Sequence, residues 1–322
     1  KLKAFCDHPV QLQVFGCQKK IIPIDKEWIG DRFNGVGSSN IRKVDISCCD
    51  AAGTDLPDNS LDAVFTDPPY FGNVQYAELM DFCYVWLKKL VGQTSSAFDA
   101  PSTRNAQELT GNVDMGRDLK HFTQGISTVF QRMAKALKKG SPFVFTYHHN
   151  KLEAYYPVAV AILDADLVCS ASLPCPGEMG GSIHINGTGS SIIDTVFVCR
   201  STGFMKRKWI ADSPKAVAEI VNADIACLKN GNVKPTTGDI RCIIFGHLVR
   251  LAIWSLRSQW KKDKPLSSRI TKVAAWLLQF GRLAEIEQFL ENDKVMTNTD
   301  KTLFAINEPL ESYETENAEI AF

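Results

Sequence analysis

Apolar residues in the first two thirds of the chain form short runs that alternate with longer, periodic stretches. The short runs are bounded by turn-forming residues, as β-strands are, and the longer stretches repeat every three or four residues, as amphipathic helices do. This alternation, from about residue 44 to residue 200, predicts an α/β protein with a mainly parallel sheet covered by helices. The expected strands are residues 44–48, 61–66, 142–147, 167–173 and 194–200.

The helices between these strands show one apolar side each. The first is marked by Leu79, Phe82, Trp86 and Leu90, and this spacing favours Trp86 as a core residue. A longer helix over residues 119–137 ends in two lysines and a glycine, a common helix stop. We expect a further helix at residues 156–163.

Beyond residue 205 the pattern turns helical. Ser213 and Pro214 are typical of a cap and a first helical turn, and apolar helices are expected at about residues 239–257 and 267–291. The expected divisions are an N-terminal segment of unclear fold, a catalytic region, a helical C-terminal domain and an acidic tail, at residues 1–42, 43–204, 205–295 and 296–322.

Composition narrows the class of protein. The chain carries 36 basic and 36 acidic residues, so its total charge neither requires nor excludes a polyanionic partner. Residues 206–272 hold 14 Lys or Arg against 5 Asp or Glu, which fits either a nucleic-acid contact or a solvated helical face. The cysteines form no C-x-x-C pair and the start has no apolar leader, so we expect a cytoplasmic protein without a membrane segment.

The candidate chemistry lies in Thr66-Asp67-Pro68-Pro69-Tyr70, directly after an apolar strand. The exocyclic amine of adenine or cytosine is a poor nucleophile because its lone pair is delocalised into the ring. An acceptor that draws on the amine hydrogens makes the nitrogen more tetrahedral as it attacks. Asp67 offers a carboxylate and Pro68 a carbonyl, while Tyr70 offers a plane on which a flipped base can stack. The alternative is a simple strand-to-loop turn.

These residues resemble the amino-methyltransferases, whose fourth motif reads Asp-Pro-Pro-Tyr, and in particular a group of adenine-specific DNA methylases. Residues 61–70, 76–87 and 187–199 carry the resemblance, which covers about residues 45 to 200. It implies a Rossmann-like methyltransferase sheet, S-adenosylmethionine as cofactor and DNA as partner. It also implies that Asp67, Pro68, Pro69 and Tyr70 line the target-amine pocket and that Thr66 and Asp67 lie beside the cofactor. Apart from the resemblance, His148 and His149 have no metal-ligand partner at regular spacing, so we expect no metal.

The same resemblance places Asp50 at the end of a strand near the adenine ring of the cofactor, although Asp50 could equally cap the following turn. The family also has a glycine-rich cofactor loop well upstream. The only matching glycine pattern in this sequence, with Gly35 and Gly37, lies too close to Asp50. The strands and helices that the family has between its glycine loop and this position would not fit. The chain therefore resembles a C-terminal catalytic part whose cofactor loop lies in a missing N-terminal half or in a separate polypeptide.

Four further residues are candidates for contacts with the substrate. Phe71, Asn73 and Tyr76 follow the motif closely enough to reach a flipped base. His148 follows the strand expected beside that of Asp67 and could face the substrate, or it could be an ordinary strand-end histidine. Two other functions stay open: a non-catalytic nucleic-acid-binding remnant or subunit, and a methyltransferase acting on RNA or on a protein amide.

Overall fold

The computed structural model contains two compact units, residues 1–53 and 54–322, which are described separately. The first unit contains two pairs of β-strands. Strands β1 (Val10–Phe15) and β2 (Gln18–Pro23) pair antiparallel, and β3 (Trp28–Ile29) and β4 (Ile41–Arg42) pair parallel. Besides these strands, the structure describes residues 49–72, 74–92, 94–112, 115–177, 191–201, 211–280 and 282–293.

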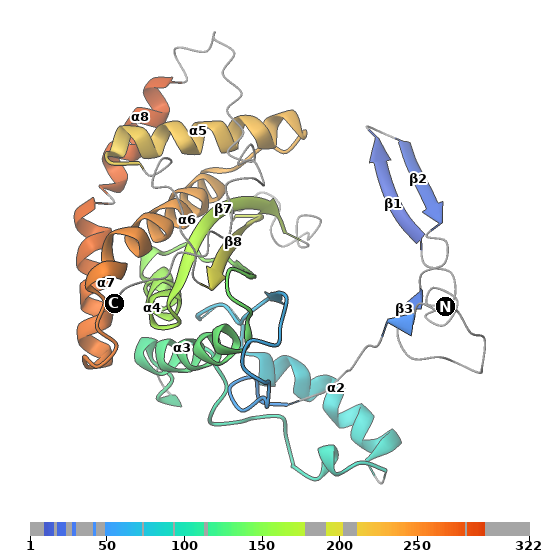
Figure 1. Cartoon of the computed structure of the whole chain (residues 1–322). Helices are drawn as coiled ribbons and strands as arrows, with labels where there is room; N and C mark the ends of the chain where they lie inside the picture. The colour runs from blue at the N-terminus through green and yellow to red at the C-terminus, as the bar shows by residue number, and fades with distance from the viewer. Residues whose placement is uncertain are drawn as a thin grey trace. The chain divides into compact units, whose positions relative to one another are not determined.

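A four-stranded sheet lies at the centre of the second unit (Figure 1). Its strand order is β5-β6-β8-β7. The strands are β5 (Val64–Thr66), β6 (Pro142–Tyr147), β7 (Leu167–Pro176) and β8 (Ile193–Ser201), and the helices are α2 (Tyr76–Val91), α3 (Leu119–Ala136), α4 (Tyr156–Asp164), α5 (Pro214–Asn230), α6 (Thr237–Leu256), α7 (Leu266–Phe280) and α8 (Leu283–Asp293). Short 3₁₀ turns occupy Ser96–Phe98, Leu152–Tyr155 and Arg257–Gln259.

The α/β class is confirmed, but the prediction of a mainly parallel sheet was wrong. Within the four-stranded sheet, β5 and β6 are the one parallel pair, whereas β8 runs antiparallel to both β6 and β7. The pairing of β7 with β8 continues to a hydrogen bond from the Gly177 N–H to the Ile192 carbonyl, as in a hairpin. Strands that return in this way must run antiparallel, and the apolar pattern that predicted them does not encode direction.

Helices α3 and α6 pack on the same face of the sheet. On α3, the Phe130 ring lies 4.7 Å from that of Phe143 on β6. On α6, Gly246 lies so close to β7 and β8 that a methyl group there would meet the Ser172 hydroxyl at 2.4 Å. Along β6 and β8, side chains that point to this buried face alternate with side chains that point to the opposite face, and those on the opposite face are half-buried. At its edge Phe65 is 75% exposed.

A buried carboxylate connects three of these helices. Asp164, at the end of α4, is fully buried and accepts hydrogen bonds from Ser127 on α3 and from the Trp260 indole, at 2.6 and 2.9 Å. Arg269 on α7 forms an ion pair with it. A buried charge of this kind is tolerated only when it is paired and hydrogen-bonded. The helices that the sequence assigned to a separate region after residue 205 share one core with the sheet.

The predicted helices are present, with two corrections. The helix expected at residues 267–291 is two helices, α7 and α8. Trp86 was predicted to be a core residue, but it is 58% exposed because α2 turns only Ala77 and Tyr84 inward. The expected strand at residues 44–48 and the acidic tail lie outside the described residues. Within the described part of the chain, no helix is long and apolar enough to cross a bilayer.

Candidate functional site

The candidate site lies where β5 and β6 end side by side. Thr66, the last residue of β5, pairs with Phe145, so the following residues Asp67 and Thr146 are also neighbours. Parallel strands present their carboxyl ends at one edge of a sheet, where α/β proteins bind ligands. An open hollow of about 330 Å³ lies at this point, lined by Phe65, Thr66, Asp67, Val144, Phe145 and Thr146.

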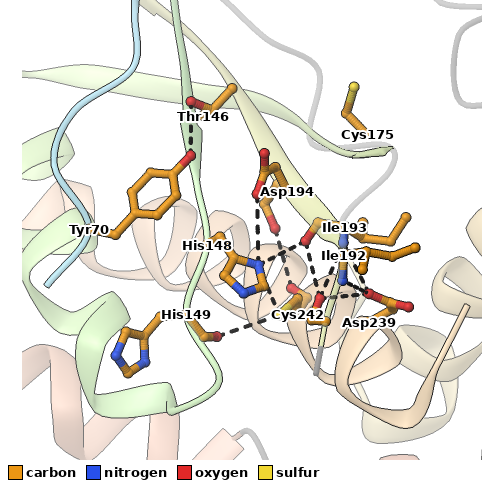
Figure 2. A network of polar contacts seen from close by, with 12 residues as sticks. Tyr70, Thr146, His148, His149, Cys175, Ile192, Ile193, Asp194, Asp239 and Cys242 are labelled. Carbon is orange, nitrogen blue, oxygen red and sulfur yellow. Dashed lines mark hydrogen bonds and ion pairs between the residues drawn. The ribbon is translucent and has the colours of Figure 1, made fainter. Parts of the chain in front are cut away.

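Two hydroxyl groups hold the carboxylate of Asp67. The Tyr70 hydroxyl lies 3.0 Å from Oδ1 of Asp67, and the Thr146 hydroxyl donates a hydrogen bond to the same oxygen. The Tyr70 and Thr146 hydroxyl oxygens are 3.3 Å apart (Figure 2). Asp67 itself is exposed at the rim of the hollow. Its carboxylate is thus oriented by neighbours from the same loop and from the adjacent strand.

The ring of Tyr70 packs between two aromatic residues of β6 and the loop after it. Its centroid lies 5.3 Å from that of Tyr147, at an edge-to-face angle of 65°, and 6.4 Å from that of His148. Burial raises the pKa of Tyr70 well above its usual value, against the opposing effect of the Thr146 hydrogen bond, and the Asp194 and Asp67 carboxylates add to the increase. The phenol therefore stays protonated and can donate.

The two aromatic residues that follow the motif have different surroundings. The N–H of Phe71 lies 3.4 Å from the Tyr147 hydroxyl, and its ring packs edge-to-face on Phe122 of α3, so Phe71 is tied to the core. Tyr76 begins α2 and is about one-third exposed. Burial and the Asp67 carboxylate raise the pKa of Tyr76, while a hydrogen bond to the Tyr70 backbone acts against them. Tyr76 therefore lies beside the motif.

His148 lies deeper, between β8 and α6 (Figure 2). Its Nδ1 is 3.0 Å from the Ile193 carbonyl oxygen and 3.8 Å from both Oδ1 of Asp194 and the Cys242 sulfur. Burial would lower the pKa of His148, but the Cys242, Ile193 and Asp194 contacts together raise it. These contacts are those of a histidine held within the fold, as the simpler interpretation of a strand-end histidine expects.

The other predicted site residues differ in what the structure says of them. Pro68 and Pro69 are half-buried and connect Asp67 to Tyr70. Asp50 belongs to the first unit, where its carboxylate accepts a hydrogen bond from the Ala52 N–H at 3.0 Å, as the turn-capping alternative expects. Asn73 lies outside the described residues, as do Gly35 and Gly37.

Sequence reasoning missed Thr146, the residue that connects β6 to Asp67. One signal was available: Thr146 is a polar residue near the end of an otherwise apolar strand, directly before Tyr147 and two histidines. Polar groups at the carboxyl end of a strand are candidates for ligand contacts in this class of sheet. What the sequence could not give is the register that places Thr146 opposite Asp67.

Among the described residues, no group of three or more His, Cys, Asp or Glu side chains is placed to hold a metal ion. Comparisons with known protein families, with curated proteins and with solved structures find no match to this chain.

Proposed function

We propose that this chain transfers a methyl group from S-adenosylmethionine to the exocyclic amine of a DNA base, with adenine N6 as the preferred target. The observation that carries the proposal is the carboxylate of Asp67, held by the hydroxyls of Thr146 and Tyr70 beside an open hollow at the carboxyl ends of two parallel strands. An oriented acceptor is what a delocalised amine requires in order to attack.

The two carboxylate oxygens of Asp67 would then have separate roles. Among the described residues, both hydrogen bonds to this carboxylate end on Oδ1. We therefore assign Oδ2 to the amine, where it would accept a hydrogen bond from one N–H. Holding the acceptor in place before the substrate arrives lowers the reorganisation needed in the transition state.

The chemical step is a direct displacement. S-adenosylmethionine, when bound, supplies a methyl group on a positively charged sulfur. The amine nitrogen would attack that methyl carbon, so that the N–C bond would form while the C–S bond breaks, with the electron pair of the broken bond staying on sulfur. Asp67 stabilises the positive charge that grows on the nitrogen. The surplus proton then leaves the amine for solvent, which can reach the exposed Asp67 carboxylate.

Tyr70 would serve as the platform for the target base. Its hydroxyl is held at Asp67 and its ring at Tyr147, so the ring is fixed before a base arrives. A base turned out of the helix stacks on a rigid aromatic plane at little entropic cost. The motif thereby combines an acceptor for the amine with a plane for the ring.

We infer that the hollow receives one end of S-adenosylmethionine. Phe65 and Val144 give it an apolar wall suited to a flat adenine ring, and Thr66, Asp67 and Thr146 give it polar groups. The amino acid end of the cofactor carries a carboxylate, which needs a cation or a row of backbone N–H groups. The six residues that line the hollow include no cation. We infer that this end would be held by residues outside the hollow.

A methyl-transfer assay tests the proposal. The purified chain is incubated with tritiated S-adenosylmethionine and duplex DNA, and label in the DNA is counted for the wild type and for Asp67→Ala. We expect transfer to fall by about 100-fold or more in Asp67→Ala, because one oriented group in the transition state is lost. The matched control is Asp62→Ala. Asp62 is an exposed aspartate just before β5, and it forms an ion pair with Lys138. This substitution should leave transfer unchanged.

A second pair of variants tests the role assigned to Thr146. Thr146→Val removes the hydroxyl that holds Asp67 and should slow transfer, whereas Thr146→Ser keeps that hydroxyl and should retain most of the rate. Transfer that is insensitive to Asp67→Ala would overturn the proposal. Labelling of RNA or of a protein in place of DNA would replace its substrate, and DNA binding without any transfer would favour a non-catalytic binding protein.

A further inference from the structure

Helix α2 carries a stripe of exposed apolar side chains. Leu79, Phe82, Trp86 and Leu90 are 59%, 73%, 58% and 79% exposed, and Cys83 is exposed between them. Residues three, four, seven and eleven positions apart lie on one side of a helix, which is the spacing of a helix-pairing seam. In Figure 1, α2 extends away from α3 and the sheet. We call these five residues the α2 stripe.

The side of α2 opposite the stripe contacts the segment that follows the helix. The Tyr84 hydroxyl donates to the Ala100 carbonyl at 2.6 Å, and the Asp81 carboxylate accepts from the Thr103 N–H. At its start, the N–H of Ala77 donates to the Glu108 carboxylate at 2.9 Å. The helix is therefore anchored by the segment after it, and the α2 stripe faces outward on a fixed support.

The exposed area is that of an interface. The α2 stripe and the neighbouring exposed side chains Met80, Val85 and Leu87 present apolar surface on the order of 800 Å². The largest apolar patch of a typical monomer is smaller, at about 300 to 600 Å². A standard protein–protein interface takes about 800 Å² from each partner. Two rigid aromatic side chains near the middle of the surface are also typical of the residues that dominate binding.

We propose that the α2 stripe is the contact surface of a dimer in which α2 packs antiparallel against α2 of a second copy. A two-fold axis across the helix needs only this one patch, because each copy presents the same surface to the other. Charge favours this arrangement. Glu78 and Lys89 lie eleven residues apart on the same border of the stripe, near opposite ends of α2. Within one chain Glu78 lies 3.9 Å from the Arg104 guanidinium, at an exposed ion pair, and the Lys89 ammonium lies 5.3 Å from the centre of the Trp86 ring. An antiparallel pair would bring Glu78 of each copy to Lys89 of the other.

Cys83 gives a direct readout, since it lies near the middle of the helix and so near the proposed axis. A short bismaleimide should link two copies through Cys83, producing a covalent dimer on a denaturing gel. Cys83→Ser should abolish this product, whereas Cys227→Ser, at an exposed cysteine of α5, should keep it. A cross-linked dimer that survives Cys83→Ser would overturn the proposed geometry.

The oligomeric state is then measured by light scattering coupled to size-exclusion chromatography, over a series of protein concentrations. We expect the wild-type chain to dimerise and Phe82→Gln/Trp86→Gln to raise the dimer dissociation constant by about 100-fold or more. Glutamine keeps helix propensity, so an unchanged far-UV circular dichroism spectrum would show that the fold is intact. Leu278→Gln, at an exposed leucine of α7, is the matched control and should leave the dimer unchanged.

Charge reversal tests the direction of packing. Glu78→Lys should weaken the dimer, and the added change Lys89→Glu should restore it, because the pairs across the axis are then opposite again. A wild-type chain that stays monomeric at all concentrations would overturn the proposal and point to another occupant of the stripe, such as residues 1–53 or a different protein. This inference is independent of methyl transfer, and either proposal can fail without the other.

Discussion

Helices α6 and α2 are both rich in apolar residues, yet α6 is buried along most of its length and α2 is exposed on most of its sides. The difference lies in what packs around them. Helix α6 lies against β7 and β8 on one side and among α4, α5 and α7 on others, whereas α2 is held by the segment that follows it. An apolar helix surface is stabilised when it is buried, but whether it is buried depends on the elements that pack around the helix.

The largest expected effect comes from a matched pair of phenylalanines. Phe245 on α6 is buried and packs edge-to-face on Tyr155, and Phe82 on α2 is 73% exposed. We expect Phe245→Ala to lower the free energy of unfolding by about 3 to 5 kcal/mol, since it leaves a cavity. Phe82→Ala should change it by no more than about 0.5 kcal/mol. Urea denaturation at low protein concentration, where self-association contributes little, gives both values.

Similar losses in the two variants would break the comparison between the helices. A large loss for Phe82→Ala would mean that α2 is covered within the single chain. A small loss for Phe245→Ala would mean that the core around α6 can close the cavity.

A medium effect is expected at the start of α6. Asp239 caps the helix with Thr236, and its buried carboxylate also accepts hydrogen bonds from the Ser191 hydroxyl and the N–H groups of Ile192 and Ile193. Asp239→Ala leaves those donors without their acceptor and should cost about 2 to 3 kcal/mol. Glu78→Ala, at an exposed carboxylate in the first turn of α2, should cost no more than about 0.5 kcal/mol.

Thermal unfolding of the two variants measures this difference. Equal melting temperatures for Asp239→Ala and the wild type would contradict the assignment of Asp239 as the contact between α6 and the start of β8.

The smallest expected effect is a pH dependence of the stability contributed by His148, which follows β6 and contacts Cys242 of α6. The pKa of His148 is raised by its contacts with Cys242, Ile193 and Asp194, so folding favours the protonated ring. The resulting stabilisation is fully present below the unfolded pKa of about 6.5 and is lost as pH rises through the folded value. The wild type should therefore exceed His148→Gln in stability by more at acidic pH than at alkaline pH. A difference that is constant across this window, or larger at alkaline pH, would contradict the assigned contacts.

The sequence predicted the helices and strands well, but it predicted less well which residues pack around each of them. The repeat of Leu79, Phe82, Trp86 and Leu90 predicted a helix, and α2 is present at Tyr76–Val91. The same repeat favoured Trp86 as a core residue, which was wrong, because periodicity identifies the apolar side of a helix but not what covers it. Likewise, alternation predicted a strand at β8 but not its antiparallel direction.

The candidate site divides in the same way. The motif itself and its place after a strand could be predicted from Asp67 to Tyr70. The contact with Thr146 could not, because it depends on the register between strands that are far apart in the chain. His148 was expected at the end of the neighbouring strand, where it lies, but its contacts with Cys242 and Ile193 follow from the packing of α6 and β8.

The central claim is that Asp67 and its neighbours act on an exocyclic amine, and the position of the transferred methyl group tests it most directly. Duplex DNA is incubated with the chain and deuterium-labelled S-adenosylmethionine, digested to nucleosides and analysed by mass spectrometry. The account predicts label in N6-methyladenine, or in N4-methylcytosine if the base preference is wrong, and its loss in Asp67→Ala. Label on a ring carbon, or equal labelling by the wild type and Asp67→Ala, would contradict it.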